Sequence, residues 1–361
     1  MKVAIITNIP SPYRVDLFNY ICKTIDITVI YSAYNEDNRN WDKDFNVQHD
    51  HIFLKSKTIK IKGKNDYKYI HIPLNIRSTL KSVNPSIVIG SEYNPTILNA
   101  LIWCKKNEVK YISWSDGTLN SERNINCIQR LSRKFICKNA NAFIASSTKT
   151  KEAQVHYGAN LNKIFISYLT VDINKYLITK KYNIKNNFLF VGRITKGKGL
   201  DLLFNALKDL KGTYHLNIVG DGPEEKKLKE LADNLKISNK ISFCGFKNQE
   251  EIVKYYANSD VFILPTRQDC FGLVITEAMC SGLPVIVSKF ADGAYDLIDE
   301  GKNGFIINPY NAEEIKEKMM YFINNENTIK VMGQQSFNRV KKFSIEEVSK
   351  EFIKAILYVG K

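Results

Sequence analysis

The sequence lacks any apolar run long enough to cross a bilayer, and it lacks the cysteine patterns of secreted or zinc-binding proteins. A membrane-spanning helix needs roughly 18 apolar residues in succession, and no run in this chain of 361 residues approaches that length. The seven cysteines form no Cys-x-x-Cys pair, and their odd number does not suit a disulfide framework. Both absences favour a protein of the reducing cytoplasm.

A glycine-rich dinucleotide motif is also missing. Residues 3–7 (VAIIT) are apolar but too few for the apolar core of a secretory signal, so they predict a first strand. Residues 8–14 (NIPSPYR), which follow, contain none of the glycines of a Gly-x-Gly-x-x-Gly turn. A nucleotide-dependent oxidoreductase or epimerase on Rossmann domains is therefore kept only as an alternative.

Acidic residues are few relative to basic ones. The chain has 52 Lys and Arg against 37 Asp and Glu, and part of the net charge of +15 lies between residues 55 and 81, where Asp66 is the single acid. Such a balance suits phosphorylated substrates, anionic lipid or nucleic acid. No recognisable nucleic-acid module accompanies the charge, so we expect no nucleic-acid partner. A non-catalytic basic scaffold and a solvated basic face without a role remain alternatives.

What is present is a repeated alternation of short apolar runs and helix-like segments, which is typical of α/β domains with parallel sheets. The length favours two domains, and a polar, aperiodic stretch near Asp172 divides the alternation. The predicted parts are a first domain at 1–172, a linker at 173–187, a second domain at 188–343, and a C-terminal helix at 344–361 that packs back at the domain boundary.

The second domain opens with a strand, a glycine and two cations. Residues 188–191 are apolar, and Gly192, Arg193 and Lys198 precede the amphipathic segment LDLLFNALKDL. A helix N-terminus after such a turn can receive an anion, since its backbone N–H groups and dipole both favour negative charge. The two cations therefore predict a diphosphate site, with merely solvated cations as the alternative.

A second stretch, DCFGLVITEAMCSGLP, follows the strand-like residues 261–265. It places Asp269 and Glu277 on either side of Gly272, where backbone donors could approach a phosphate closely. The two carboxylates could accept hydrogen bonds from sugar and ribose hydroxyls; the alternative is a surface Asp and a helix-capping Glu. Gly220 and Gly245 end two further strands, and ligands of open α/β sheets bind at such strand ends.

Together these stretches resemble the donor domain of family-four retaining glycosyltransferases, whose GT-B fold consists of two facing Rossmann-like domains with parallel sheets and an interdomain cleft. The resemblance covers essentially the whole chain. It implies that Arg193 and Lys198 bind the donor diphosphate and stabilise it as it leaves. It also implies that Glu277 binds the ribose and that the backbone near Gly245 and Phe246 lies close to the base.

The same resemblance assigns the turn before Glu277. Phe271, Gly272 and Leu273 match the segment that places backbone amides against the β-phosphate and sugar. Asp269 stands where the family has a Glu, so its carboxylate is about a methylene short of the donor sugar. The family needs no obligatory metal or other cofactor; Asp42 and Asp44 have the spacing of a metal-binding pair but lie in a polar loop, so we expect no metal.

The first domain departs further from the family. Many relatives have a His at the end of the fourth strand, whereas this chain has Ser91 there with Glu92 beside it. The candidate catalytic side chains are Glu92 and Asp116; Asp116 follows the next strand. The alternative for Glu92 is an ordinary carboxylate at a strand end without a catalytic role. The resemblance of residues 8–14 to a first acceptor-side loop assigns three residues to the acceptor: Pro12, Tyr13 and Arg14.

Residues 127–138 (CIQRLSRKFICK) predict an amphipathic helix. Ile128, Leu131 and Phe135 share one face, and four cations lie largely on another: Arg130, Arg133, Lys134 and Lys138. The helix could dock on an anionic membrane that carries a lipid-linked acceptor, or it could cover a sheet.

The resulting hypothesis is a cytoplasmic, peripheral glycosyltransferase. It would move a sugar from a nucleotide-diphosphate sugar, with retention, to a glycan or polyprenyl-diphosphate-linked glycan. The product would belong to a bacterial surface polysaccharide, that is, O-antigen, capsule or exopolysaccharide.

Overall fold

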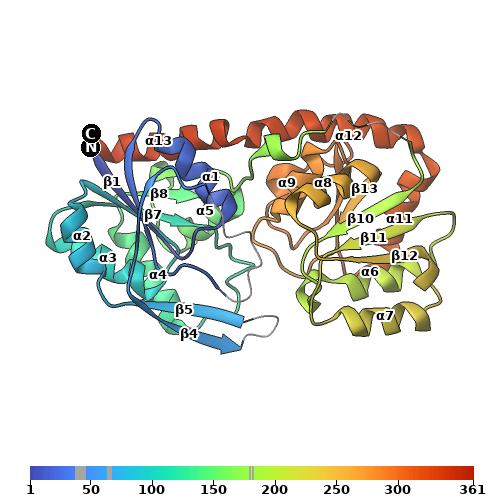
Figure 1. The fold of residues 1–361 in the computed structure, drawn as a ribbon, viewed down its shortest axis with the longest axis horizontal. Coiled ribbons are helices and arrows are strands. Elements are labelled where there is room, and N and C mark those ends of the chain that lie inside the picture. Colours follow the sequence, from blue (N-terminus) through green and yellow to red (C-terminus); the bar gives the residue numbers. More distant parts are fainter. Residues whose placement is uncertain (37–45, 63–66, 179, 181–182) are drawn as a thin grey trace. The chain divides into compact units, whose positions relative to one another are not determined.

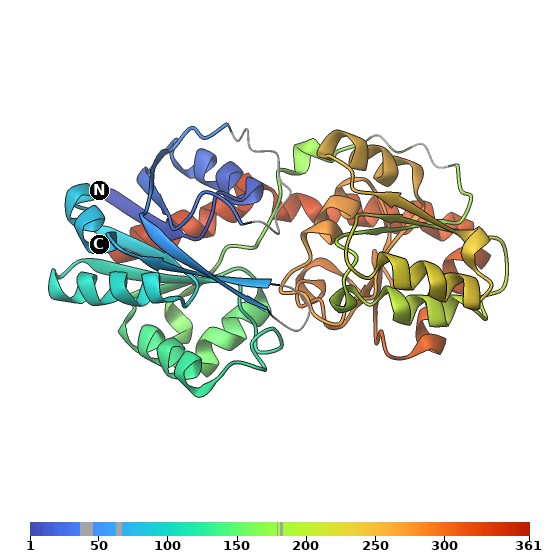
Figure 2. The ribbon, with the colours of Figure 1, turned by 60° about the horizontal axis from the view of Figure 1, so that its bottom comes forward.

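A computed structural model describes residues 1–36, 46–62, 67–178, 180 and 183–361 (Figure 1). The chain forms two compact units: unit 1 comprises Met1–Val171 and Ile345–Lys361, and unit 2 comprises Asp172–Ser344. Each unit contains one main sheet, with helices on both of its faces (Figures 1 and 2). Asp42 and Asp44, the pair with metal-ligand spacing, lie outside the described residues.

The main sheet of unit 1 has seven strands in the order β3-β2-β1-β6-β7-β8-β9, and its neighbouring strands run parallel. These strands are β1 (Lys2–Thr7), β2 (Asp26–Tyr31), β3 (Asp50–Phe53), β6 (Ile87–Ser91), β7 (Lys110–Ser115), β8 (Ala142–Ala145) and β9 (Ile164–Ile166). Most of their side chains are buried on both faces, which explains why the strands are near-continuous apolar runs.

The described residues of unit 1 form six α-helices: α1 (Pro12–Ile21), α2 (Ile76–Val83), α3 (Pro95–Lys106), α4 (Cys127–Asn139), α5 (Thr148–His156) and α13 (Ile345–Gly360). Val3 and Ile5 pack with α1 and α13, whereas their neighbours Ala4 and Ile6 pack with α2 and α3. The alternation of side chains along β1 therefore assigns these helices to opposite faces of the sheet.

A feature that the sequence did not predict is the two-stranded sheet of β4 (Ser56–Lys62) and β5 (Tyr67–Pro73). The two strands are antiparallel and pair from Ser56 with Pro73 to Lys62 with Tyr67. The lysine-rich segment of the chain thus forms a hairpin, in which Ile59 and Ile61 alternate with lysines and stay exposed. β3 and β9 are also absent from the sequence-based prediction.

Unit 2 has a six-stranded parallel sheet in the order β12-β11-β10-β13-β14-β15. Its strands are β10 (Asn187–Val191), β11 (His215–Val219), β12 (Ile241–Gly245), β13 (Val261–Leu264), β14 (Val285–Ser288) and β15 (Gly304–Ile307). Its helices are α6 (Leu200–Leu207), α7 (Glu225–Asn234), α8 (Gln249–Asn258), α9 (Leu273–Cys280), α10 (Ala294–Leu297), α11 (Ala312–Asn324) and α12 (Glu326–Val340). The strands predicted at 188–191, at 261–265 and before Gly220 and Gly245 are present as β10, β13, β11 and β12. The predicted fold class of two Rossmann-like domains is confirmed.

Short 3-10 helices connect several of these elements: η1 (Leu161–Lys163), η2 (Ile173–Lys175), η3 (Lys196–Lys198), η4 (Ser238–Lys240) and η5 (Lys341–Phe343). Within the described residues, no helix has both the length and the apolar character that crossing a membrane requires.

Helix α13 completes the core of unit 1 although it is the last element of the chain. Phe352 is fully buried, and its ring meets the ring of Trp114 edge to face at 5.1 Å. Ser167 Oγ donates a hydrogen bond of 2.8 Å to the Val348 carbonyl. Phe352 thus connects α13 to the middle of the sheet of unit 1.

We predict that Phe352→Ala lowers the free energy of unfolding of unit 1 by about 3–5 kcal/mol, because it leaves a cavity under α13. Urea unfolding followed by tryptophan fluorescence measures this unit alone, since Trp41, Trp103 and Trp114 all precede Val171. The matched control is Leu357→Ala on the exposed side of the same helix, which should change stability by about 0.5 kcal/mol or less. Equal losses in both variants would contradict this role of Phe352.

Candidate active site

The order of strands in unit 2 reverses between β10 and β13. β11 and β12 extend the sheet on one side of this pair, and β14 and β15 extend it on the other. Open parallel sheets bind ligands at such a point, outside the carboxyl ends of the strands. Both predicted donor stretches start here, because Gly192 follows β10 and Thr266 follows β13.

The structure brings these two stretches into direct contact. Lys198 Nζ lies 2.6 Å from Asp269 Oδ2, and the two side chains are 25% and 20% exposed. The backbone N–H of Arg267 and the hydroxyl of Thr266 both donate to the Gly197 carbonyl, at 2.8 and 3.0 Å. A cation and a carboxylate that are far apart in the sequence are thus held side by side at the surface.

Arg267 is a residue of this site that the sequence reasoning missed. Its guanidinium binds both carboxylate oxygens of Asp201 at 2.7 Å, and it also donates to the Lys196 carbonyl at 2.7 Å. Burial opposes ionisation of Asp201, but the Arg267 fork outweighs it and lowers the pKa of that carboxyl. Arg267 therefore fixes the cation-bearing turn to the start of α6; its position directly after a strand end was the available signal.

Close backbone contact explains one of the glycines in the turn. Gly199 has a φ of +73°, and a Cβ at this position would lie 2.1 Å from the Pro265 carbonyl oxygen. Only glycine satisfies both the left-handed conformation and this approach. The turn after β10 can therefore rest directly on the loop after β13.

Helix α9 begins beside Asp269. Gly272, at the N-cap with a φ of +82°, has no side chain to cap the first backbone N–H groups of the helix. Phe271 is buried, and its N–H donates to Asp269 Oδ1 at 3.3 Å. The N-terminal end of α9, where Leu273 is the first residue, is thus suited to a phosphate group.

Glu277 lies one turn further along α9 and contacts aromatic residues. Tyr256 Oη donates a hydrogen bond of 2.8 Å to its carboxylate. Burial raises the pKa of Glu277 to about 6, against the hydrogen bonds from Tyr256 and Tyr176. Neither tyrosine was identified from the sequence, because α8 and η2 reach α9 only through the tertiary fold.

The ends of β11 and β12 lie next to each other. The Gly220 N–H donates to the Gly245 carbonyl at 2.9 Å, and Gly245 has a φ of +70°. Phe246, which follows, exposes 54% of its surface. An exposed ring directly after a strand end offers a flat apolar face for a base.

A second group of polar residues lies in unit 1, at the point where its own strand order reverses. β1 and β6 are neighbours there, and Asn94 Nδ2 donates to Asn8 Oδ1 at 2.9 Å. Glu92, which follows β6, has a left-handed φ of +72°, which is uncommon for a residue with a side chain. Its Oε1 accepts the Asp116 N–H at 3.0 Å.

Burial, and then the nearby Asp116 carboxylate, raise the pKa of Glu92 to about 7. Asp116 itself binds Arg14 Nη2 at 2.6 Å through Oδ2 and accepts the hydroxyl of Ser146 through Oδ1. The structure therefore brings both predicted catalytic carboxylates and the predicted acceptor-side Arg14 into one cluster.

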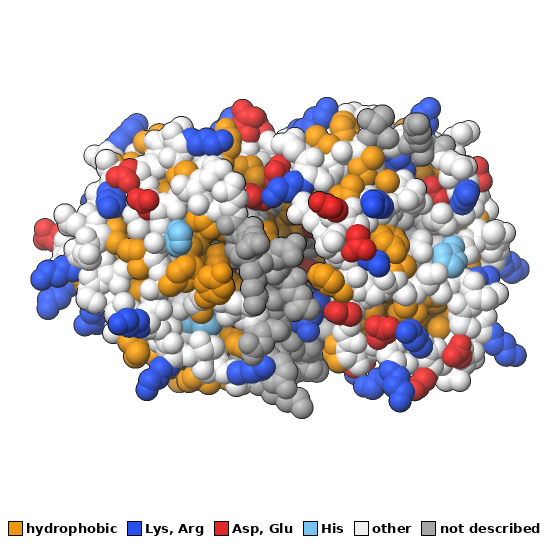
Figure 3. Space-filling model, viewed as in Figure 1, with side chains coloured by type: hydrophobic (Ala, Val, Ile, Leu, Met, Phe, Trp, Pro, Cys, Tyr) orange, Lys and Arg blue, Asp and Glu red, His pale blue; other side chains and the backbone are white. Residues whose placement is uncertain are grey.

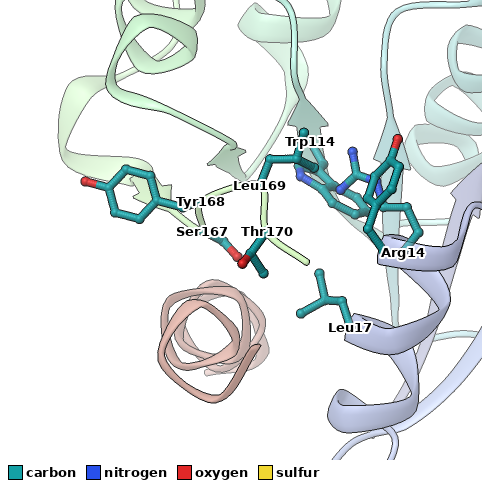
Figure 4. A pocket seen from close by; sticks show the side chains of 8 residues that line it. Arg14, Leu17, Trp114, Ser167, Tyr168, Leu169 and Thr170 are labelled. Carbon is teal, nitrogen blue, oxygen red and sulfur yellow. The ribbon is translucent and has the colours of Figure 1, made fainter. Parts of the chain in front are cut away.

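Arg14 also lines a small crevice of unit 1 (Figure 4). Its guanidinium lies 3.6 Å from the centre of a Trp114 ring, in the geometry of a cation–π contact. Tyr13, Leu17 and the segment 167–170 complete the lining, and Pro12 is the first residue of α1. Within the described ranges, no group of three or more His, Cys, Asp or Glu side chains is arranged to hold a metal ion.

Comparison with known proteins gives a family match in unit 2. Residues 175–339 match the family described as glycosyl transferases group 1. An uncharacterized glycosyltransferase of Haemophilus influenzae is 27% identical over 79% of this chain and 80% of its own length. The capsular polysaccharide biosynthesis glycosyltransferase CapM of Staphylococcus aureus is 30% identical over 58% of this chain and 56% of its own length. The glycosyltransferase MJ1178 of Methanocaldococcus jannaschii is 29% identical over 51% of this chain. The present chain spans 60% of the length of that relative.

Solved structures match along nearly the whole chain. The lipopolysaccharide outer core galactosyltransferase WaaB has a TM-score of 0.77 at 20% identity and covers 99% of both chains. Anabaena HepE in complex with UDP has a TM-score of 0.79 at 17% identity and covers 99% of this chain and 100% of its own. These similarities confirm the predicted GT-B fold class.

We predict that Gly199→Ala destabilises unit 2 more than Gly301→Ala does. The two glycines have nearly equal φ values, +73° and +72°, but a Cβ at Gly301 would meet nothing within 4 Å. Gly301→Ala should therefore carry only the backbone penalty of about 1–2 kcal/mol, and Gly199→Ala a further 1–3 kcal/mol or so for the collision with Pro265. Urea unfolding followed by circular dichroism measures both. Equal effects would contradict the close contact between the two loops.

Proposed function

We propose that this chain, whose residues 175–339 match the model of the glycosyl transferases group 1 family, transfers a sugar from a nucleotide-diphosphate sugar to a glycan or polyprenyl-diphosphate-linked glycan. The observation that carries the proposal is the contact between Lys198 and Asp269 at the point where the strands of unit 2 change order. A diphosphate at this point would meet a cation and the N-terminus of α9. The sugar of the donor would meet the carboxylate of Asp269.

In the proposed reaction the bond between C1 of the sugar and the diphosphate oxygen breaks, and an acceptor oxygen bonds to C1. The leaving diphosphate keeps the electron pair, and its negative charge is greater in the transition state than in the bound donor. Arg193 and Lys198 stabilise that charge, so they act on the rate as well as on donor binding. Lys198 has three N–H donors and can bind the phosphate while it keeps its contact to Asp269.

The acceptor hydroxyl must lose a proton in the same reaction. We propose that Glu92 takes it, because a base works best when its pKa lies near the working pH, and the pKa of Glu92 is raised to about 7. Asp116 and Arg14 hold the surrounding segment in place. These side chains and the helix N-terminus supply the charges that the reaction needs, so no metal ion is included in the proposal.

Membership of family four, retention of the anomeric configuration and the use of a uridine nucleotide belong to the proposal as well. They are supported by the motif at Arg193 and Lys198, and the uridine nucleotide by the similar structure HepE, which was solved with UDP and with UDP-glucose. Ribose binding by Glu277 and base contact by Phe246 extend it. Capsule and lipopolysaccharide enzymes among the similar proteins support a surface polysaccharide as product. The proposed place is the cytoplasm, at the inner face of the membrane when the acceptor is lipid-linked.

The test is a panel of UDP-, GDP- and dTDP-sugars assayed for hydrolysis and transfer. One nucleotide sugar should be turned over and should raise the melting temperature, while NAD should do neither. Lys198→Ala and Arg193→Ala should each lower kcat roughly 10²- to 10³-fold, since each removes a charge that stabilises the leaving group. Lys196→Ala, an exposed cation of the same turn, is the matched control and should keep near-normal turnover. Near-normal turnover in Lys198→Ala, or stabilisation by NAD alone, would overturn the proposal.

The pH dependence tests the role of Glu92. The rate of the unmodified chain should rise as pH increases through about 7, because Glu92 must be ionised to accept a proton. Asp116→Asn removes a negative neighbour, so the pKa of Glu92 falls. The rising limb of the pH–rate profile, that is, the range in which the rate increases with pH, therefore moves to lower pH. Glu92→Gln should remove the limb together with most of the activity.

The quantity to compare is the pH at which the rate rises and not the maximal rate, because Asp116→Asn also removes the partner of Arg14. Asp209→Asn, a change of an exposed aspartate in unit 2, is the control and should leave the limb in place. An unshifted limb in Asp116→Asn would assign the titration to another group.

A further inference from the structure

We infer that the exposed face of α4 docks unit 1 on an anionic lipid surface. The apolar side chains that suggested a sheet-covering helix point to solvent: Ile128 is 72% exposed, Leu131 65% and Phe135 41%. α4 packs instead through Arg133, Ile136 and Cys137. The sheet-covering alternative is therefore wrong for this stripe, because its side chains are exposed.

A basic stripe lies beside the apolar one on the exposed side of α4. Arg130, Lys134 and Lys138 are spaced four residues apart, so they lie on one face of the helix, and all three are exposed. No Asp or Glu occurs between Arg123 and Lys151. On the surface shown in Figure 3, by contrast, basic side chains are interspersed with acidic ones.

Helix α3 extends the basic edge. Lys105 Nζ lies 6.0 Å from the centre of the Phe135 ring and donates to Asn139 Oδ1. Lys105 and Lys106 are both exposed at the C-terminal end of α3. The apolar stripe of α4 is thus flanked by cations on two sides.

An apolar stripe flanked by cations favours a lipid surface as the binding partner over a second copy of the chain or nucleic acid. Leu, Ile and Phe side chains flanked by cations fit the boundary between lipid headgroups and acyl chains, and anionic headgroups attract the cations. A second copy of this chain would bring two basic faces of a protein of net charge +15 together. Nucleic acid would use the cations but leave the apolar stripe in water.

The buried side of α4 connects this surface to the acceptor-side cluster of the same unit. Arg133 Nε and Nη2 donate to the Glu122 carboxylate at 2.8 and 2.6 Å, and the guanidinium lies 4.8 Å from the centre of the Tyr93 ring. Glu122 belongs to the segment that follows Asp116, and Tyr93 follows Glu92. A docked α4 would therefore set the two carboxylates at a fixed distance from the lipid. This last step rests on the proposed function, whereas the lipid contact does not.

Vesicle flotation of the full chain without donor tests the contact. The chain should float with phosphatidylcholine vesicles that contain phosphatidylglycerol, much less with phosphatidylcholine alone, and less as salt increases. Each cation near an anionic surface contributes roughly fivefold to partitioning, so Lys134→Ala with Lys138→Ala should lower binding roughly 25-fold. Leu131→Ser should lower it roughly tenfold by removing an inserted side chain.

Matched controls come from unit 2. Val331→Ser changes an apolar side chain that is 60% exposed on α12, and Lys226→Ala with Lys227→Ala removes two exposed cations from α7. Both should bind vesicles like the unmodified chain. Lys198→Ala, which removes transfer under the proposed function, should also float normally, so failure of the one proposal is distinguishable from failure of the other.

Three results would overturn the inference: no flotation with phosphatidylglycerol, equal losses in the α4 and control variants, or a fluorophore on the exposed Cys127 that shows no spectral shift when the chain floats. Size-exclusion chromatography checks the competing occupant. If Leu131→Ser changes the oligomeric state and not vesicle binding, the face belongs to a second copy of the chain and the lipid assignment is wrong.

Discussion

Reversal of strand order in each parallel sheet is the constraint on which both polar sites depend. The connections on the two sides of such a point leave the sheet in opposite directions, so the carboxyl ends of two neighbouring strands stay uncovered. In unit 2 these strands are β10 and β13, and in unit 1 they are β1 and β6. Because the strands themselves are buried on both faces, their ends are where charged groups can meet a ligand.

The two ion pairs on which the argument rests differ in what they contribute. Lys198 and Asp269 are partly exposed, and such pairs are worth only about 0–1 kcal/mol. Their contact is therefore weak enough for a diphosphate to compete for the cation. Arg133 and Glu122 form a buried fork of two hydrogen bonds, and loss of either partner would leave a buried charge. The first pair suits ligand exchange, and the second holds α4 in place.

The strands of unit 2 could be predicted because they are short apolar runs, most of which end in a glycine or a proline-containing turn. The hairpin of β4 and β5 could not, because its alternation of lysine and isoleucine leaves the apolar side chains exposed and gives no core pattern. Sequence order also placed Arg193, Lys198 and Asp269 at strand ends. It could not find Tyr256, and although Arg267 follows a strand end, the sequence did not identify its partner, since both partners are chosen by tertiary contact. For α4 the periodicity identified an apolar stripe but not the direction in which it faces.

The cluster in unit 1 shows how one environment gives two carboxylates different properties. Asp116 has a cation against it, with Arg14 at 2.6 Å, and Arg14 in turn rests on the ring of Trp114. Glu92 accepts the Asp116 N–H, and burial and the Asp116 carboxylate raise its pKa against the opposing charge of Arg14. The left-handed backbone at Glu92 is a local strain that the surrounding contacts must hold.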